Sequence, residues 1–305
     1  SLQIILVINK KKEFIGTVTD GDIRAGILNG INLNEKISKI VNRNSITLNE
    51  RSSYEEASQL MEKKKINHVP IIKGKKIVGL YLRNKKIQKT LKQNIILIMA
   101  GGKGKRLMPL TKFIPKPLLK FKRKTLLDLQ LDKIFNEGFK NVYLSVNYLK
   151  EKIIKKIKKL ESSKLNIQFI IEKKPLGTAG SLYYLRKKTN TPIIITNCDI
   201  VSSLNYNELL SFHKNNQSDL TVVIKEYKSE NPFGLIKFRK RQITEIEEKP
   251  INLTFVNAGI YVLQPSILRY IKKEHYLDMN DLINNLMKKK KTIVPYPLVN
   301  SWYDV

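Results

Sequence analysis

The sequence predicts two α/β domains: a doubly wound domain with a mostly parallel sheet over residues 93–305, preceded by a small α+β domain over residues 1–92. Three observations lead to this prediction. The length of 305 residues matches two ordinary domains at roughly 150 residues each. The first third contains an internal repeat. The remainder alternates apolar, strand-like runs with helix-like stretches.

The composition excludes several classes of protein. Hydrophobic residues make up 42% of the chain, which argues against disorder, and glycine and proline are too few for collagen. The single cysteine, Cys198, cannot form an internal disulfide, and no apolar run reaches the ~20 residues of a membrane-spanning helix. We therefore expect a folded cytoplasmic protein without a membrane partner. Because the chain opens on Ser1 rather than Met, it is treated as a possible fragment.

The net charge of +31 favours polyanionic partners, with nucleic acid as the obvious candidate. The charge is spread along the chain, however, with 19 basic and 8 acidic residues in 1–92 and 38 and 18 in 93–305. Lysines outnumber arginines 47 to 10, whereas contacts to bases favour arginine. We therefore favour a solvated surface over a nucleic-acid-binding one.

The repeat in the first domain places VINKKKEFIG (residues 7–16) over PIIKGKKIVG (residues 70–79), a shift of 63 residues. Each copy predicts a strand, a Lys-rich turn and a second strand that enters a glycine. Between the copies, residues 53–65 carry apolar side chains at helical spacing, with Ser52 or Ser53 available as the N-cap. The corresponding helix of the first copy would precede Leu2, so we expect that copy to lack its opening elements.

With GTVTDGDI at residues 16–23, this pattern resembles the paired cystathionine-β-synthase (CBS) domains over roughly residues 1–92. The resemblance implies an adenine nucleotide near Thr19 and Asp22 that regulates the neighbouring domain, and pairing into a homo-oligomer. A turn and a helix N-cap would explain the same two residues about as well. Leu82 and Lys85 stand at the equivalent positions of the second copy, so at most one such site is expected.

The second domain begins near residues 91–94, where a Lys-rich stretch gives way to the apolar run IILIMA, residues 95–100. This run predicts a buried parallel strand. It leads into GGKGKRLMPLTKFIPKPLL, residues 101–119. Gly101, Gly102 and Gly104 allow consecutive backbone N–H groups to face an anion, and nearby Lys and Arg side chains add positive charge. The implied ligand is a phosphate, although the segment fits neither the Walker nor the GxGxxG pattern.

The following elements continue the alternation expected of a doubly wound sheet. Strands are predicted at NVYLSVN, IQFII and IIIT. Helices are predicted near residues 125–137, in the Lys-rich stretch after the first of these strands, and from Thr178. Two close strand pairs around residues 220–262 depart from the alternation and suit a sugar-binding subdomain.

Four further motifs follow in order: PLGTAGSL at residues 175–182, NCD at 197–199, EEKP at 247–250 before NAGIYVL, and WYDV at the end. Together with the glycine-rich segment, they resemble the sugar-1-phosphate nucleotidyltransferases over roughly residues 95–305. The resemblance implies a Rossmann-like fold. It also implies transfer of a nucleoside monophosphate to a hexose-1-phosphate, with release of pyrophosphate. Family members continue past the W-x-D segment, so the domain is expected to be incomplete at its C-terminus.

The resemblance also implies a role for each matching residue. The amides at Gly101, Gly102 and Gly104, together with Gly177, would bind the nucleotide, and Arg106 and Lys116 would neutralise its phosphates. Asp199 and Asp304 would hold Mg²⁺, a cation that prefers few, hard oxygen ligands. The sugar phosphate and sugar would contact Gly234, Glu248, Lys249, Asn257 and Asp278.

The residue type at Glu172 predicts the base of the nucleotide substrate. Relatives that transfer thymidylate or uridylate carry Gln at this position, whereas a carboxylate accepts from the two adjacent donors of guanine. We therefore predict GTP, with a uridylyl- or thymidylyltransferase as the alternative and a solvent-facing Glu172 as the simpler explanation. The fusion of a CBS pair to this domain resembles enzymes that activate glucosamine-1-phosphate or a related hexose-1-phosphate for surface glycans, and this resemblance implies glucosamine-1-phosphate or mannose-1-phosphate as the acceptor.

Two other classes of function remain open, a nucleic-acid-binding module and a catalytically silent nucleotide sensor. Cys198 could suggest thiol catalysis, but no histidine lies near it in sequence, so a small buried filler beside Asp199 is favoured.

Overall fold

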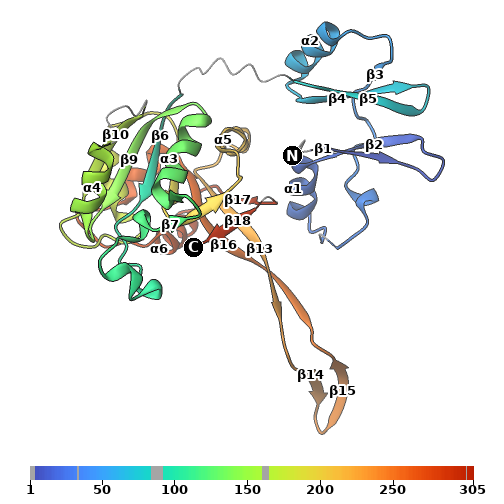
Figure 1. Cartoon of the computed structure of the whole chain (residues 1–305). Coiled ribbons are helices and arrows are strands. Elements are labelled where there is room, and N and C mark those ends of the chain that lie inside the picture. The colour runs from blue at the N-terminus through green and yellow to red at the C-terminus, as the bar shows by residue number, and fades with distance from the viewer. Residues whose placement is uncertain (1–3, 33, 84–91, 160–164, 300) are drawn as a thin grey trace. The chain divides into compact units, whose positions relative to one another are not determined.

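The computed structural model describes residues 4–32, 34–83, 92–159, 165–299 and 301–305. The chain forms two compact units, Ser1–Gln88 and Lys89–Val305 (Figure 1), and each is considered by itself. Lys85 and part of the boundary expected near residues 91–94 lie outside the described residues.

The first unit contains the predicted repeat as two antiparallel strand pairs. β1 (Ile4–Ile8) pairs with β2 (Phe14–Thr19), and β4 (His68–Lys73) pairs with β5 (Lys76–Leu82). The Phe14 N–H donates to the Lys75 carbonyl at 2.7 Å and so joins the two copies. The remaining elements of the unit are α1 (Asp20–Leu28), a 3₁₀ turn (Ile37–Lys39), β3 (Leu48–Asn49) and α2 (Tyr54–Lys64).

The helix between the copies has the predicted start. Ser53 caps α2: its hydroxyl accepts from the Glu56 N–H, and the Glu56 carboxylate accepts from the Ser53 N–H. Ala57 and Met61 lie on the same face of the helix and pack against Val69 of β4, which forms a small core for this unit.

The second unit is built on a seven-stranded sheet in the order β10-β9-β6-β11-β16-β13-β17, in which only β16 runs against the others. This arrangement confirms the predicted mostly parallel, doubly wound class. The strands are β6 (Lys92–Met99), β9 (Phe139–Val146), β10 (Asn166–Ile171), β11 (Ile193–Asn197), β13 (Leu220–Glu230), β16 (Ile251–Leu263) and β17 (Ile293–Pro297).

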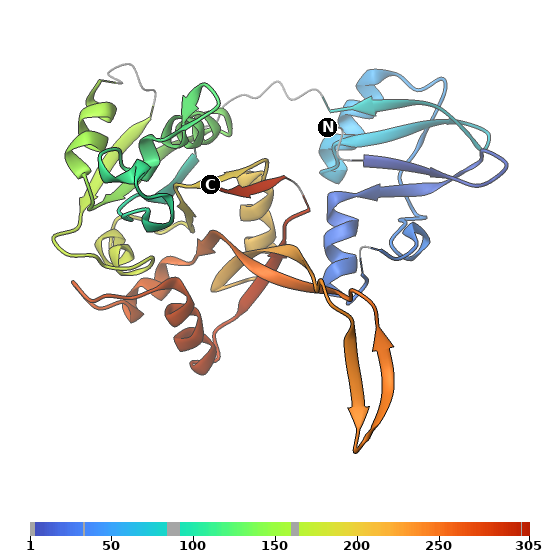
Figure 2. The ribbon, with the colours of Figure 1, turned by 60° about the horizontal axis from the view of Figure 1, so that its bottom comes forward.

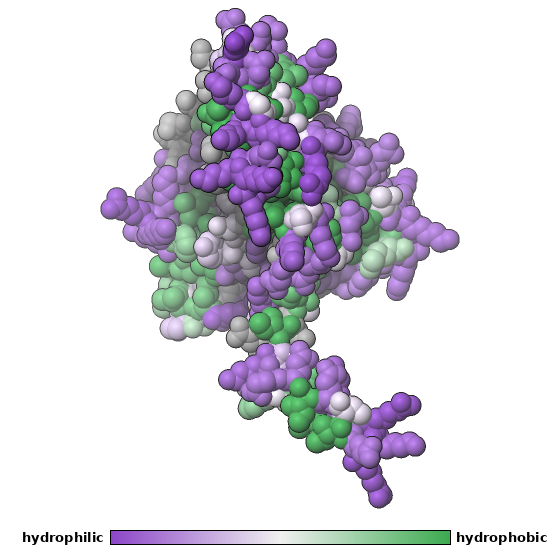
Figure 3. All heavy atoms as spheres, turned by 90° about the vertical axis from the view of Figure 1, so that its right-hand side faces the viewer, coloured by the Kyte–Doolittle hydropathy of each residue, from purple (hydrophilic) through white to green (hydrophobic). Residues whose placement is uncertain are grey.

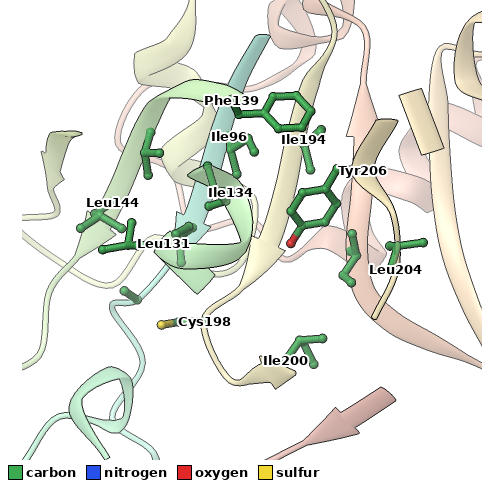
Figure 4. Close-up of a cluster of buried hydrophobic side chains, with 14 of the residues drawn as sticks. Ile96, Leu131, Ile134, Phe139, Leu144, Ile194, Cys198, Ile200, Leu204 and Tyr206 are labelled. Atoms are coloured by element: carbon green, nitrogen blue, oxygen red, sulfur yellow. The ribbon is translucent and has the colours of Figure 1, made fainter. Parts of the chain in front are cut away.

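Both faces of the sheet are covered, because alternate residues of β6 point to opposite sides. Ile96 and Ile98 join a core with α3 (Leu126–Asn136), α4 (Lys150–Lys158) and α5 (Tyr206–Asn215), part of which Figure 4 shows. Ile95 and Leu97 join a second core with α6 (Met279–Lys288) and a 3₁₀ helix (Gly180–Leu185). Another 3₁₀ helix, Pro265–Tyr270, also packs into this second core.

The helix expected from Thr178 has a different form from the predicted one. Instead of an α-helix, the chain forms the 3₁₀ helix Gly180–Leu185. The preceding backbone is drawn to another segment, since the Ala179 N–H donates to the Leu277 carbonyl at 2.9 Å. Leu182 and Leu185 still reach the core, because residues three apart share a face of a 3₁₀ helix.

β13 and β16 extend beyond the sheet as a long ribbon that ends in the hairpin of β14 (Leu235–Arg239) and β15 (Gln242–Glu247), as Figures 1 and 2 show. The register pairs Ile236 with Ile246 and Phe238 with Ile243, and all four side chains are exposed. Figure 3 shows apolar residues gathered on this ribbon against a largely hydrophilic surface.

Two pairs of short strands and three single turns lie outside this sheet in the described part of the unit. β7 (Lys120–Phe121) pairs with β8 (Lys124–Thr125), and β12 (Ile200–Ser202) pairs with β18 (Trp302–Asp304). Single 3₁₀ turns form at Lys105–Leu107, Leu110–Lys112 and Lys116–Leu118. In the described part of the chain, no helix is both long and apolar enough to cross a membrane.

Candidate active site

The glycine-rich loop after β6 leaves room for a ligand. Apart from Gly102 itself and its two neighbours in sequence, no described residue has an atom within 4 Å of the point where a side chain at Gly102 would begin. Gly104 adopts a φ of 60°, and a Cβ there would lie 2.8 Å from the Thr111 side chain, so glycine is favoured at this turn. The loop is therefore open beside Gly102 and tightly held at Gly104.

This loop forms one wall of a cavity of about 360 Å³. The cavity gathers most of the residues predicted to handle phosphate and metal, from three separate stretches of sequence. They are Gly102, Gly104, Arg106, Lys116, Asp199 and Asp304. Lys105, Asn197 and Cys198 also line it.

Asp199 and Asp304 are brought together by the short strands β12 and β18. Ile200 stands opposite Asp304 in this pair, and the Val305 N–H donates to the Asp199 carbonyl at 3.2 Å. Cys198 and Ile200, which flank Asp199, are both buried in the core (Figure 4). They anchor the backbone on each side of Asp199, whose carboxylate lines the cavity.

The Lys116 ammonium lies close to both carboxylates. Its Nζ is 2.7 Å from Asp199 Oδ2 and 3.9 Å from Asp304 Oδ1. Burial raises the pKa of the Asp304 carboxyl and the charge of Asp199 raises it further, whereas Lys116 and Arg106 act in the opposite direction. The raised pKa indicates that the nearby positive charge does not fully offset burial and the second carboxylate.

The residues present fit a divalent cation held jointly with substrate. Asp199 Oδ1 is buried and has no hydrogen-bond partner among the described residues, which leaves it available as a ligand atom. Within the described ranges, no group of three or more His, Cys, Asp or Glu side chains is placed to hold a metal. Mg²⁺ is often bound in this way, by one or two carboxylates completed by substrate phosphates and water.

Glu172 lies beneath the glycine-rich loop. Its side chain is buried, which excludes the solvent-facing alternative. Ser145 donates its hydroxyl to Oε1 at 2.6 Å, and the Leu176 N–H donates to Oε2 at 3.0 Å. Oε1 would also lie 3.5 Å from a Cβ at Gly101, so the carboxylate is adjacent to the loop. Glu172 thus ties β9 to the loop that follows β10.

A second cavity of about 410 Å³ adjoins the first and shares Arg106, Asn197 and Asp304 with it. Asn257 and Asp278 line this second cavity, as do three residues that sequence reasoning did not single out, Thr178, Asn280 and Trp302. Thr178 and Trp302 stand inside motifs quoted above, and Asn280 is two residues after Asp278, so proximity to a motif was the available signal.

Hydrogen bonds hold one wall of the second cavity together. Asp278 Oδ1 accepts from the Thr178 N–H at 3.1 Å, and Asp278 Oδ2 accepts from the Tyr276 hydroxyl at 2.7 Å. Gly177, with a φ of 73°, packs so closely that a Cβ would lie 2.5 Å from the Leu277 carbonyl oxygen. Gly177 therefore has a packing role in this wall.

Three of the residues predicted for the sugar phosphate lie elsewhere. Gly234, Glu248 and Lys249 are exposed on the ribbon, where β13 and β16 give way to the terminal hairpin. They line neither of the two cavities. Glu248 Oε2 would lie 3.1 Å from a Cβ at Gly234, so these two residues face each other across the ribbon.

Thr19 and Asp22 of the first unit form a complete capping box at the start of α1. The Thr19 N–H and hydroxyl both donate to Asp22 Oδ2 at 2.7 Å, and the Thr19 hydroxyl accepts from the Asp22 N–H at 3.4 Å. The capping role is thus observed, and the ligand-binding role stays a prediction. Leu82 ends β5 in the second copy.

Cys198 behaves as the expected buried filler. Its side chain lies in the core, and burial raises the pKa of its thiol far above the ordinary value, so the reactive thiolate is disfavoured.

Comparison with protein families matches residues 95–305 to the family described as nucleotidyl transferase, and residues 37–83 to the CBS domain. The mannose-1-phosphate guanyltransferase of Yarrowia lipolytica is 33% identical over 217 residues, and that of Pichia angusta is 34% identical over 218. Each alignment covers 68% of this chain and 60% of the relative. The chain thus spans about 60% of the length of these curated relatives.

Solved structures agree on the fold. HddC from Yersinia pseudotuberculosis superposes with a TM-score of 0.55 at 24% sequence identity, over 69% of this chain and 93% of that chain. The same protein complexed with GMP-PN gives a TM-score of 0.54 at 23% identity, with the same coverage.

Proposed function

The chain belongs to the nucleotidyl transferase family, and from this premise we propose that it transfers GMP from GTP to a hexose-1-phosphate and releases pyrophosphate. The observation that carries the proposal is that the open glycine loop, Lys116 and the Asp199–Asp304 pair line one cavity. An oxygen of the sugar phosphate attacks the α-phosphorus of GTP, and the bond from that phosphorus to the bridging oxygen of the leaving pyrophosphate breaks. Such a transfer needs positioning and charge neutralisation rather than a covalent enzyme intermediate.

The cavity residues divide this work. The backbone amides around Gly102 face the triphosphate, while Arg106 and Lys116 offset its charge and that of the leaving pyrophosphate. Asp199 and Asp304 would hold Mg²⁺, a cation that is usually bound by one or two carboxylates. When bound there, Mg²⁺ neutralises charge on the reacting phosphates. The unpartnered Asp199 Oδ1 supports this assignment.

The second cavity takes the sugar. Its walls present amide, hydroxyl and carboxylate groups from Asn257, Asn280, Thr178 and Asp278, which suit the hydroxyls of a hexose. Its shared border with the first cavity would place the sugar phosphate next to the α-phosphorus. In this proposal, Gly234, Glu248 and Lys249 of the ribbon also contact the bound sugar phosphate, although they line neither cavity.

The choice of GTP rests on Glu172 and on the relatives. Each carboxylate oxygen has two lone pairs, so the bonds from Ser145 and Leu176 leave acceptor capacity for the N1–H and N2–H₂ of guanine. The names of the curated relatives, mannose-1-phosphate guanyltransferases, point to the same base. We propose mannose-1-phosphate or glucosamine-1-phosphate as acceptor, in the cytoplasm, for nucleotide-sugar and surface-glycan synthesis.

Pyrophosphate release tests the proposal directly. Purified chain is assayed with GTP, ATP, UTP or dTTP against mannose-1-phosphate, glucosamine-1-phosphate and glucose-1-phosphate, with Mg²⁺ or with EDTA. We expect the fastest release with GTP and a complete dependence on the divalent cation. Faster turnover of UTP or dTTP would overturn the choice of base, and no release in any combination would overturn the activity.

The first unit is proposed to bind an adenine nucleotide at Thr19 and Asp22 and to change the transfer rate. Support comes from the match of residues 37–83 to a CBS domain and from the repeat, which extends the same pattern to the copy that contains Thr19 and Asp22. The predicted pairing of two such repeats also favours a homo-oligomer. Calorimetric titration with AMP and ATP, together with transfer rates at saturating nucleotide, tests this regulation. Neither heat of binding nor a change in rate would discard it.

A further inference from the structure

Lys116 combines a fixed backbone with a side chain that lies between two carboxylates. Its backbone is fixed by the 3₁₀ turn Lys116–Leu118, where the Leu119 N–H donates to the Lys116 carbonyl at 3.0 Å and Pro117 is buried. The Lys116 side chain, in contrast, carries its ammonium at the end of a flexible four-carbon stem. The ammonium at the end of that stem lies within ion-pair distance of both Asp199 and Asp304.

The ammonium therefore neutralises the same two carboxylates that would hold the cation. Lys116 and Asp199 are both largely screened from solvent, with side-chain exposures of 20% and 24%. A charge pair in such a site is screened by water much less than one on the surface. A divalent cation entering between the carboxylates would meet the ammonium at short range, and the two positive charges would repel each other.

We infer that Lys116 acts as an internal stand-in for the metal, and that the incoming triphosphate draws it away so that metal and nucleotide bind together. This inference rests on the proposed function, since it uses the same cavity. Phosphate oxygens give the ammonium a new partner on the other wall of the cavity, which frees the carboxylates for the cation. Lys116 thereby couples the two binding events.

The coupling has a thermodynamic consequence. If nucleotide strengthens metal binding by removing Lys116 from the aspartates, metal strengthens nucleotide binding by the same factor. Without nucleotide the carboxylates remain paired with Lys116, so the metal site stays weak until a triphosphate is present. The pairing of Lys116 with the two carboxylates would limit the binding of free divalent cations to the enzyme without nucleotide.

Binding of Mn²⁺ to the full chain without nucleotide, followed by the paramagnetic resonance of free Mn²⁺, tests the inference without any assay of activity. We expect Lys116→Met to bind Mn²⁺ about tenfold more tightly than the wild-type chain, and Lys116→Arg to remain close to wild type because it keeps the positive charge. Lys105→Met is the matched control, since Lys105 lines the same cavity, whereas among the described residues Lys116 forms the ion pairs with Asp199 and Asp304.

Asp199→Asn separates the failure of this inference from the failure of the proposed function. If Mn²⁺ binding depends on Asp199 but Lys116→Met tightens it no more than Lys105→Met, the stand-in role is overturned and the metal site stands. If Asp199→Asn leaves Mn²⁺ binding unchanged, the proposed metal site fails and the inference fails with it. Thermal unfolding of each variant shows whether it is folded, and Lys116→Gln, which also removes the charge, repeats the test should Lys116→Met unfold.

Discussion

The two halves of the candidate site are supported in different ways. Asp199 follows β11, a strand inside a seven-stranded sheet covered on both faces, and an ion pair with Lys116 holds its carboxylate. Lys249 lies on a two-stranded ribbon whose side chains are exposed at that level. Strands in a covered sheet move only when a large part of the core opens, whereas an isolated two-stranded ribbon is marginally stable. In the proposed site, the phosphate half is therefore organised before substrate binds, whereas the contribution of Lys249 to the sugar phosphate would depend on where the ribbon lies.

Asp199→Asn gives the largest expected effect and tests the rigid half. We expect pyrophosphate release to fall by about 10²–10³-fold, because a group preorganised around the reacting phosphates is lost. Asp132→Asn is the control, since Asp132 pairs with Lys124 on an exposed face of α3. A fall of less than fivefold, with a normal unfolding temperature, would show that this cavity is not the catalytic centre.

The pH dependence of stability at His213 tests the packing of the core beneath the rigid half. Its ring is buried on α5, its Nδ1 lies 2.8 Å from the Thr221 hydroxyl, and burial lowers its pKa to about 4. Between the ordinary value and about pH 4, the unfolded chain binds a proton that the folded chain does not. Stability should therefore decline as pH falls from about 6.5 to about 4, by roughly 2–3 kcal/mol from this residue.

Urea unfolding at pH 7 and at pH 4.5 measures this contribution of His213 to the free energy of unfolding. In His213→Gln the change in the free energy of unfolding between the two pH values should be smaller than in the wild-type chain. Equal changes in both proteins would mean that His213 is protonated inside the fold.

Lys249→Met probes the ribbon half. We expect the KM for the sugar phosphate to rise about tenfold while the KM for GTP stays unchanged, because a charge-assisted contact to phosphate is lost. Lys240→Met, at the turn between β14 and β15, removes the same charge from the same ribbon. Equal effects from the two substitutions would reduce the role of Lys249 to the general charge of the ribbon.

Two glycines of the phosphate loop give the smallest expected effects. Gly104→Ala should lower stability by about 1 kcal/mol, because its φ is positive and Thr111 occupies the space of a Cβ. Gly102→Ala should change stability by less than about 0.5 kcal/mol and weaken GTP binding severalfold, because the methyl group would point into open space. If Gly102→Ala left GTP affinity unchanged, the nucleotide would not approach the loop at that residue.

Most of the fold could be predicted from local signals. The repeat, the apolar runs and the capping residue Ser53 each depend on neighbours in sequence, and the structure has the corresponding strands and helix. The segment after Thr178 was predicted with the wrong helical form, because its hydrogen bonds to Leu277 come from a distant part of the chain. The hydrogen-bond partners of Glu172 could not be predicted either, since Ser145 and Leu176 approach it only in the folded protein.

By itself, the sequence determined the residue types and their order: the glycine loop, the basic side chains beside it, and aspartates placed after a buried strand and near the end of the chain. Only the tertiary structure decided that Asp199 and Asp304 share one ammonium, and that Lys249 lies outside the cavity they form. The physical reason is that strand periodicity and turn chemistry act over a few residues, whereas the pairing of β12 with β18 and the course of the ribbon depend on contacts between segments far apart in the chain.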